Sequence, residues 1–365
     1  MAQQQTCLIQ PPGGLGPPVT SHSYPIPELK EPHDVLVRVS AVALNPTDYK
    51  MPEFHHTPNA IMGCDFTGTV VAVGPEVTDV FPGTRLCGSV QGSNPANPDL
   101  GSFAEYLVTD RRLLLKVPDS FSDLEAAALG GIGWTTVALV MEDSLGLTGC
   151  PSKPAPPRED GSRQPVLIYG GATATGTMAC QILSICGYDP IALASDASSG
   201  LVKKYGAAMT VPYTSPTCGD TIRSHTKGQL RHAIDCITSP ESVRCCLTAI
   251  GRTGGRCATL DYAPEEWRTR KAVKIDMPMA YVTTGKEVNL NGVFHRDADI
   301  TKFHLATRWR EEVQVLVDQG RIQCHPPQEV PGRWDGIAKG LEMLKAGQVR
   351  GHKLVVRVSW AGNLD

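Results

Sequence analysis

The chain has 365 residues, and 34 Lys and Arg against 37 Asp and Glu give a formal net charge of −3. At about 100–200 residues per domain, this length predicts two domains, each with its own core. The sequence has no basic run, which excludes nucleic acid as a partner because phosphate binding needs a concentrated positive surface. The N-terminus has no basic segment before an apolar stretch, so a secretory signal is not expected.

The longest uncharged stretch, residues 126–141, is rich in Gly and Ala. A membrane span needs about 20 strongly apolar residues, so this stretch is predicted to be a buried helix, and no membrane is expected as a partner. The twelve cysteines include no C-x-x-C pair. Neither a zinc ribbon nor a redox motif is therefore predicted, and most of the cysteines should be buried free thiols in a reducing compartment.

The first third of the chain has the pattern of short strands. Residues 35–39, 68–74 and 104–109 are apolar or alternating runs separated by Gly, Pro and Asn. Such strands predict a small antiparallel barrel. The segment Ser122-Asp-Leu-Glu125 is a capping box, which predicts the start of a helix and the edge of a second domain. The segment 149–165 is rich in Pro and is expected to be an exposed loop.

Residues 166–260 alternate between strand and helix patterns. Strands are predicted at 166–169, 190–194, 209–211, 232–237 and 256–260, and helices at 177–186, 198–205 and 240–250. This alternation is typical of a parallel sheet covered on both faces, a doubly wound domain. Residues 262–300 have no clear pattern. Amphipathic helices at 306–317 and 337–344 and a strand at 354–358 follow.

A turn rich in Gly, Ala and Thr, residues 170–176, connects the first of these strands to its helix. In a dinucleotide site such a turn lets the backbone approach a pyrophosphate, which binds the N–H groups at the helix N-terminus. Thr173 stands where the middle glycine of the usual pattern is expected, and its hydroxyl is able to bond a phosphate oxygen. A tight turn without a ligand is the structural alternative for this motif taken alone.

The end of the next strand, Ser195-Asp-Ala-Ser198, occupies the place that separates NAD sites from NADP sites. NAD sites carry a carboxylate there for the ribose 2′-OH, whereas NADP sites carry hydroxyls and cations around the 2′-phosphate. Ser195 and Ser198, followed by Lys203 and Lys204, favour NADPH. Asp196 favours the opposite choice, and a solvated helix face is the alternative for at least one of the two lysines.

Four motifs in this order resemble the medium-chain dehydrogenase/reductase superfamily: residues 43–48 (ALNPTD), 63–74 (GCDFTGTVVAVG), 77–88 and the turn at 170–176. Within it, residues 45–50 (NPTDYK) and 169–175 (YGGATAT) are most similar to the stand-alone, trans-acting enoyl reductases of fungal polyketide synthases, such as the lovastatin enzyme. Residues 230–238, 249–255 and 353–357 support the same branch. The resemblance extends from about residue 30 to residue 358.

The resemblance implies an α/β fold with a GroES-like β-barrel catalytic domain, built from residues 1–135 and 323–365, and a Rossmann NADP-binding domain at 136–322. Zinc-dependent members carry Gly-His-Glu where this chain has Gly63-Cys-Asp65, and they carry a four-cysteine lobe that the loop 91–100 lacks. Because Cys64 alone cannot hold a catalytic zinc, no metal is expected. The branch also implies a monomer.

The resemblance also assigns the site residues, position by position. The cofactor-binding residues are Pro46, Thr47, Asp48, Tyr49 and Lys50 beside the nicotinamide, Ala172, Thr173, Ala174 and Thr175 at the pyrophosphate, Ser195, Asp196, Ala197 and Ser198 at the 2′-phosphate, Tyr213 at the adenosine, Leu260 and Asp261 near the nicotinamide, and Gly351 and His352 from the C-terminal lobe. The residues expected to border the acyl chain are Thr136, Val137, Ala138, Leu139, Val140, Met141, Glu142, Asp143, Thr283, Thr284, Gly285 and Lys286. A surface lysine is the alternative for Lys50, and a packed surface aromatic is the alternative for Tyr213.

The implied function is reduction of an α,β-unsaturated polyketide thioester by NADPH, in secondary-metabolite biosynthesis and in the cytoplasm. The thioester is held on the acyl carrier domain of a partner polyketide synthase or PKS-NRPS megasynthase. Lys50 and Thr135 are the predicted catalytic residues: Lys50 as a cationic donor to the developing enolate, and Thr135 as a hydroxyl that orients the nicotinamide or the substrate carbonyl. The alternatives are a zinc-independent quinone or small-enone reductase and a non-catalytic nucleotide-binding scaffold.

Overall fold

The computed structural model describes residues 3–359. The chain forms two compact units: Met1–Ile132 with Tyr281–Asp365, and Gly133–Ala280. Residues 281–322, which were expected in the nucleotide domain, therefore lie in the first unit. The reason is the packing of α8 (Ile300–Asp318) on the barrel, where the Gln314 side chain accepts a hydrogen bond from the Lys116 N–H (2.7 Å) and donates one to the Lys116 carbonyl (3.1 Å).

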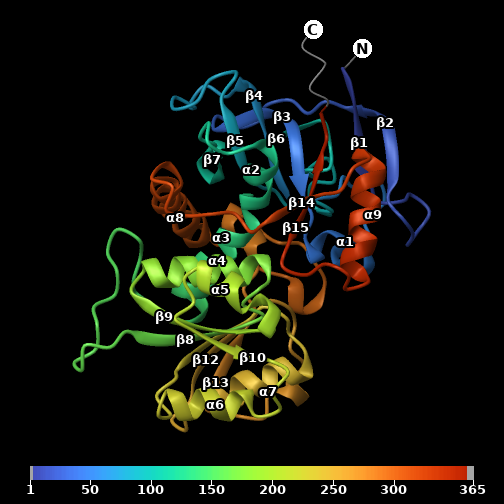
Figure 1. Ribbon diagram of the computed structural model, residues 1–365. Helices are drawn as coiled ribbons and strands as arrows, with labels where there is room; N and C mark the ends of the chain where they lie inside the picture. The colour runs from blue at the N-terminus through green and yellow to red at the C-terminus, as the bar shows by residue number, and fades with distance from the viewer. Residues whose placement is uncertain (1–2, 360–365) are drawn as a thin grey trace. The chain divides into compact units, whose positions relative to one another are not determined.

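A seven-stranded sheet forms the core of the first unit. Its order is β14 (Pro327–Glu329), β15 (Lys353–Arg357), β3 (Asp34–Ala43), β4 (Asp65–Val73), β5 (Arg85–Ser89) and β7 (Leu115–Lys116), and β6 (Tyr106–Asp110) also pairs with β3. Strand β15 pairs antiparallel with β3, so segments from both ends of the chain build one sheet, as expected (Figure 1). Val35, Val37 and Val39 of β3 are buried in the barrel core.

The hairpin of β1 (Gln4–Ile9) and β2 (Val19–Pro25) was not predicted. The remaining helical elements of the first unit are α1 (Pro46–Phe54), η1 (Arg111–Leu113), α2 (Asp123–Leu129), η6 (Gly292–Phe294) and α9 (Arg333–Lys345). The turn η5 (Ala280–Thr284) begins at the boundary between the units. Helix α2 starts with the predicted capping box, in which the Ser122 hydroxyl accepts from the Glu125 N–H.

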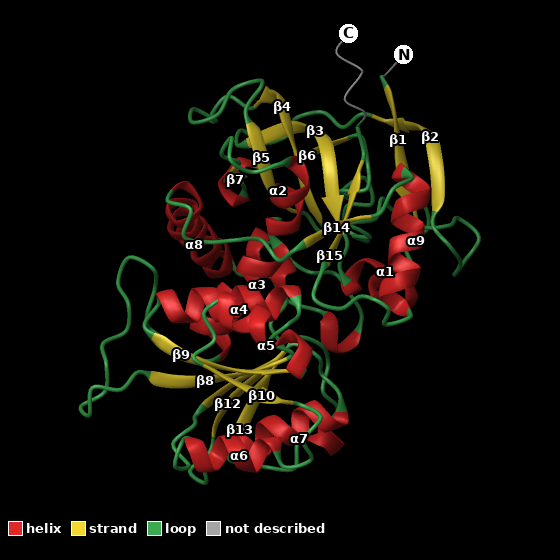
Figure 2. Cartoon of the chain, viewed as in Figure 1, coloured by secondary structure: helices red, strands yellow, loops and turns green. Residues whose placement is uncertain are grey.

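The second unit contains the predicted parallel sheet, with six strands in the order β10-β9-β8-β11-β12-β13. This is the 3-2-1-4-5-6 order of a Rossmann domain. The strands are β8 (Gln164–Tyr169), β9 (Tyr188–Ala194), β10 (Met209–Pro212), β11 (His232–Asp235), β12 (Gly255–Thr259) and β13 (Val273–Asp276). Helices α4 (Ala174–Ile185) and α5 (Ser199–Lys204) cover one face, and α6 (Cys218–His225) and α7 (Pro240–Ala249) cover the other (Figure 2).

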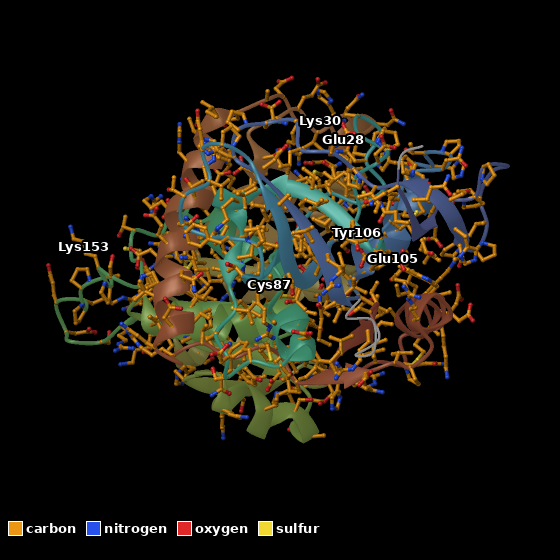
Figure 3. All side chains as sticks on the ribbon, turned by 90° about the horizontal axis from the view of Figure 1, so that it is seen from above. Glu28, Lys30, Cys87, Glu105, Tyr106 and Lys153 are labelled. Carbon is orange, nitrogen blue, oxygen red and sulfur yellow. The ribbon has the colours of Figure 1, made fainter. Side chains whose placement is uncertain are left out.

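The predicted loop at 149–165 is confirmed, since β8 begins only at Gln164 and most of the preceding residues are exposed. Lys153 lies where this loop extends into solvent (Figure 3). The cysteines also agree with the prediction: all twelve are free thiols, and nine of them are buried.

The apolar stretch 126–141 is buried but is not one continuous helix. Helix α2 ends before Gly130 (φ 48°), and the chain continues as α3 (Ile132–Leu139) and the π-helix η2 (Val140–Ser144). Within the described residues, Asp123–Ser144 is the one stretch long and apolar enough by composition to cross a membrane, and 72% of its apolar window is buried in the structure. Core helices of soluble proteins have the same composition.

Candidate functional site

The turn after β8 is held by Thr173. Thr173 is the N-cap of α4: its hydroxyl accepts from the Gly176 N–H (3.0 Å) and donates to the Gly170 carbonyl (2.9 Å). The hydroxyl that we considered as a phosphate ligand thus has partners inside the turn. It stabilises the loop on which a phosphate would rest.

Three glycines allow this turn to be tight. Gly170 has a φ of 76°, which favours glycine. A Cβ at Gly171 would lie 2.7 Å from the Ala192 Cβ, and a Cβ at Gly176 would lie 2.3 Å from the Gly170 carbonyl oxygen. The first N–H groups of a helix have no acceptor within the helix, so those of Ala174 and Thr175 are suited to an anion. The turn therefore fits the pyrophosphate of a dinucleotide.

The remaining predicted cofactor residues of the second unit also follow strand ends. The Tyr213 N–H donates to the Ala194 carbonyl (3.4 Å), which places Tyr213 next to the loop at 195–198. Within that loop the Ser195 hydroxyl donates to the Ser198 hydroxyl (3.0 Å), while Asp196 and Ala197 are exposed. The Leu260 N–H donates to the Asp235 carbonyl (3.0 Å), next to the end of β11.

Together these segments lie at the carboxyl edge of the sheet. Strands β8 and β11 are neighbours and mark the point where the strand order reverses. A Cβ at Gly170 would lie 2.9 Å from the Ile237 side chain, so the turns after these two strands are in close contact. Dinucleotides bind at this switch point in Rossmann domains.

The residues expected beside the acyl chain are mostly buried in the second unit. Residues 135–141 on α3 and η2 are buried, Glu142 is half-buried and Asp143 is exposed. The π-helix end is anchored by the Ser144 hydroxyl, which donates to Asp276 (2.5 Å), and by Arg256, which donates to the Ser144 carbonyl (3.3 Å). A π-helical turn is often found at functional sites. The assignment of these residues to the acyl chain stays a prediction.

Helix α1 of the first unit carries Lys50. Its N-cap is Asn45, Pro46 is its first residue, and the Asp48 carboxylate accepts from the Asn45 N–H (2.7 Å) to complete a capping box. Lys50 lies in the middle of the helix and is half-buried. The predicted nicotinamide-binding residues 46–50 are thus the first five residues of one helix.

A buried carboxylate, Asp65, connects this helix to two other segments. Asp65 Oδ2 accepts from the Asn45 side-chain amide (2.9 Å) and pairs with the Lys353 ammonium (3.2 Å). Asp65 Oδ1 accepts from the N–H groups of Gly131 and Ile132, both at 2.9 Å. Lys353 also donates to the Asn45 side chain. The sequence reasoning did not identify this hub, although residues 63–74 and 353–357 were both noted as motifs.

The phenol of Tyr281 bonds the start of α1. Its hydroxyl lies 2.8 Å from Thr47 Oγ1 and 3.6 Å from Cys64 Sγ. Burial, and after it the charge of Asp48, raises the pKa of Cys64 well above its ordinary value, so the thiol is neutral. Cys64, at the position where the resemblance implies His in zinc-dependent proteins, thus has a tyrosine hydroxyl as its neighbour. Among the described residues, no group of three His, Cys, Asp or Glu side chains is arranged to hold a metal ion.

The segment after Tyr281 is attached to both ends of α1. At the far end of the helix, the Asn291 N–H donates to His55 Nδ1 (3.4 Å), and the rings of His55 and Phe294 stack edge to face with centroids 5.4 Å apart. This segment includes the predicted substrate residues 283–286, of which Thr283 is buried and Lys286 is exposed. The segment that contains residues 283–286 is therefore hydrogen-bonded to α1, the helix that carries Lys50, and both belong to the first unit.

Gly351 and His352 lie just before β15. Gly351 has a φ of 65°, and the exposed His352 ring contacts the Arg350 carbonyl through Nδ1 (3.0 Å). The assignment of His352 to the cofactor stays a prediction.

Asp48 makes the stability of the protein depend on pH. Its carboxylate is buried, and burial raises its pKa to about 7, against the opposing effects of the hydrogen bonds from the Asn45 N–H and the Cys64 thiol. Between about pH 4 and 7 the folded chain retains a proton that the unfolded chain releases, so folding stability falls as the pH rises. We therefore expect the free energy of unfolding of Asp48→Asn, relative to that of the parent protein, to rise by about 2–3 kcal/mol from pH 5 to pH 8. Urea unfolding at each pH measures this difference.

The exposed Asp119 provides the control for this measurement. Asp119→Asn makes the same chemical change at the surface, and its effect on stability is subtracted at each pH. A constant difference between Asp48→Asn and the parent from pH 5 to 8 would show that Asp48 is ionised throughout.

Comparison with known proteins identifies relatives of both units. Residues 31–119 match the family of alcohol dehydrogenase GroES-like domains, and residues 174–313 match the zinc-binding dehydrogenase family. The trans-enoyl reductase calK of Penicillium decumbens is 45% identical over 92% of this chain and 92% of its own length. The trans-enoyl reductase sthE of Phaeosphaeria nodorum is 43% identical over 99% of both chains.

Solved structures show the same fold. An alcohol dehydrogenase superfamily protein from Novosphingobium aromaticivorans matches 98% of this chain and 100% of its own with a TM-score of 0.73, at 22% identity. The agreement at this low identity concerns the fold alone. It confirms the expected combination of a GroES-like unit and a Rossmann unit.

Proposed function

The chain belongs to the trans-enoyl reductase family of the medium-chain dehydrogenase/reductase superfamily, and from this premise we propose that it reduces α,β-unsaturated polyketide thioesters with NADPH. The thioester is carried by the acyl carrier domain of a partner polyketide synthase or PKS-NRPS megasynthase. The enzyme works in secondary metabolism, in the cytoplasm and as a monomer. The observation that carries the proposal is the 43–45% identity to trans-enoyl reductases over nearly the whole chain.

The second unit holds the nicotinamide cofactor in this proposal. The turn 172–175 takes the pyrophosphate at the N-terminus of α4, and the loop 195–198 takes the 2′-phosphate. Tyr213 lies next to that loop with its ring 6.4 Å from the ring of Tyr169, which suits the adenosine end. Leu260 and Asp261, at the end of β12, border the nicotinamide end.

The first unit supplies the charge that the reaction needs. When bound, the reduced nicotinamide supplies a hydride to the β-carbon, and negative charge develops on the thioester oxygen. The Lys50 ammonium stabilises this enolate, and the Thr135 hydroxyl orients the nicotinamide or the carbonyl. A donor that is already fixed before the reaction lowers the barrier most, and α1 is fixed at its start by Asp65 and Tyr281. The proton for the α-carbon comes from Lys50 or from water.

The choice of NADPH over NADH is expected to depend on two hydroxyls. The double variant Ser195→Ala/Ser198→Ala removes both hydroxyls that face the 2′-phosphate in this proposal. NADH has no 2′-phosphate, so its binding loses no contact. We expect KM for NADPH to rise about tenfold, which corresponds to about 1.4 kcal/mol, and KM for NADH to change less than twofold. Steady-state kinetics with both cofactors measure this. An equal rise for both cofactors would show that the loop does not read the 2′-phosphate.

Substrate class is tested by offering the enzyme two acceptors with NADPH. A crotonyl thioester of a pantetheine or of an acyl carrier protein should be reduced, and a benzoquinone should not. If the benzoquinone is reduced, and neither the pantetheine thioester nor the carrier-bound thioester is, the protein is instead a quinone reductase. Binding of NADPH without turnover of any acceptor would identify a nucleotide-binding scaffold.

A further inference from the structure

Two thiols of the second unit are in contact on the face of the sheet covered by α6 and α7. The sulfur atoms of Cys218 and Cys245 lie 3.0 Å apart. Cys218 is the first residue of α6, and Cys245 lies in the middle of α7. The two residues belong to different helices and are 27 positions apart in the chain. A bond between them would connect two separate elements of the Rossmann unit.

The backbones of these helices are close enough for a disulfide. A Cβ at Gly219 would lie 2.9 Å from the Thr248 Cβ and 3.0 Å from the Cys245 carbonyl oxygen. Only a residue without a side chain allows this approach, so Gly219 brings the neighbouring Cys218 against α7. A disulfide needs a separation between Cβ atoms of about 3.5–4.5 Å, which helices in such contact can reach with a small movement.

The pair differs in accessibility from the other thiol contact of the same unit. The Cys218 and Cys245 side chains retain 6% and 8% exposure, whereas Cys246 and Cys257, which are also hydrogen-bonded to each other, are fully buried. An oxidant therefore reaches Cys218 and Cys245 before it reaches Cys246 and Cys257.

We propose that Cys218 and Cys245 are a redox-sensitive pair that forms a disulfide when the protein meets a hydroperoxide. In the first step the Cys218 sulfur attacks one peroxide oxygen and the O–O bond breaks. The thiol proton passes to the leaving oxygen, so that a cysteine sulfenic acid and water or an alcohol form. In the second step the Cys245 sulfur attacks the Cys218 sulfur, the S–S bond forms and water leaves. The peroxide is reduced by two electrons, and the two thiols are oxidised together by two electrons. A dithiol reductant reverses the bond.

The place of the pair gives the disulfide a local consequence. Cys218 and Cys245 pack in one apolar cluster with Tyr169 and Val211. Tyr169 immediately precedes the phosphate turn, and its ring lies against that of Tyr213. The disulfide therefore fixes α6 to α7 directly behind the segment assigned to the adenosine. This modification is independent of the proposed enzyme activity.

The experiment treats the full-length protein with hydrogen peroxide, blocks remaining thiols with N-ethylmaleimide, and identifies cross-linked peptides by mass spectrometry without reduction. Because Cys245 and Cys246 are adjacent, the assignment uses variants. We expect the peptide that contains Cys245 and Cys246 to be cross-linked to the Cys218 peptide at least ten times more often than to the Cys257 peptide. Cys218→Ser and Cys245→Ser should each abolish it, and Cys257→Ser and Cys246→Ser should leave it unchanged.

Gly219→Ala provides a second test that keeps both thiols. Its added Cβ must push α6 away from α7, so the yield of the cross-link should fall at least fivefold while circular dichroism shows an intact fold. The proposal is overturned if peroxide leaves Cys218 and Cys245 reactive toward N-ethylmaleimide, or converts Cys218 to a sulfinic acid without cross-linking. It is also overturned if Cys246→Ser removes the cross-link.

Discussion

Replacement of Lys50 by alanine is expected to lower kcat for thioester reduction by about 10²–10³, because one fixed donor to a developing oxyanion accounts for a factor of this size. Lys50 lies in the middle of α1, and side chains at both ends of the helix hold it in place, among them Asn45, Thr47 and His55. The fold should therefore be retained. Single-turnover kinetics with saturating NADPH measure the effect on the chemical step.

A matched lysine separates this effect from a general loss of positive charge. Lys30 is an exposed lysine of the same unit (Figure 3). Lys30→Ala should leave kcat within twofold of the parent protein. If Lys50→Ala also retains the parent rate, Lys50 has no role in the chemical step, and the enolate must be stabilised by another group.

Removal of the Asp65 carboxylate is expected to have the largest effect on stability. Asp65→Ala would leave the Lys353 ammonium, which is only 7% exposed, without its anionic partner, and it would leave the N–H groups of Gly131 and Ile132 unpaired. Breaking a buried ion pair from one side costs about 3–5 kcal/mol. Urea unfolding monitored by circular dichroism and by tryptophan fluorescence measures the change.

Two further variants keep this prediction testable if Asp65→Ala does not fold. Asp65→Ala/Lys353→Met removes both charges and should recover at least half of the lost free energy of unfolding. Glu329→Ala removes one side of the exposed pair with Arg357 and should cost less than about 1 kcal/mol. A cost for Asp65→Ala as small as that of Glu329→Ala would show that the hub does not stabilise the first unit.

The elements with a clear hydrophobic period were predictable. The alternation of β3 and the strand and helix patterns of residues 166–260 led to the barrel and the parallel sheet, because these elements bury one face or both. The helix predicted at 240–250 is present as α7, with Ser239 as its N-cap and Pro240 as its first residue. At each of these elements, residues close together in the sequence were sufficient to predict the local structure.

Elements that depend on distant partners were not predictable. The stretch 126–141 appears as one apolar run, but Asp65 breaks it: the Asp65 carboxylate occupies the space where a Cβ at Gly130 would lie, at 2.5 Å, and accepts the next two N–H groups. Helix α1 contains Pro46 and Pro52, which hide its helical character in the sequence. Its stability comes from the Asn45 and Asp48 cap and from tertiary contacts.

The candidate site shows the same division. The phosphate turn and the loop 195–198 were assigned from local motifs, and their geometry suits a dinucleotide. Tyr281 and Asp65 were missed because each acts by joining segments far apart in the chain: Tyr281 reaches Thr47 across 234 positions. Residues 281–322 were expected in the nucleotide domain but lie in the first unit, because contacts with distant residues, such as that of Gln314 with Lys116, decide where α8 packs.

The central claim is that hydride passes from the nicotinamide to the β-carbon of an unsaturated thioester. It is tested most directly with NADPH that carries deuterium on C4 of the nicotinamide, in the two stereoisomers, and a crotonyl thioester on an acyl carrier protein. With one stereoisomer, mass spectrometry and NMR of the saturated acyl group should locate one deuterium on the β-carbon. The new hydrogen on the α-carbon should be a proton that exchanges with the solvent, not the deuterium of the cofactor. A saturated product without deuterium at the β-carbon from either isomer, or no saturated product at all, would contradict the claim.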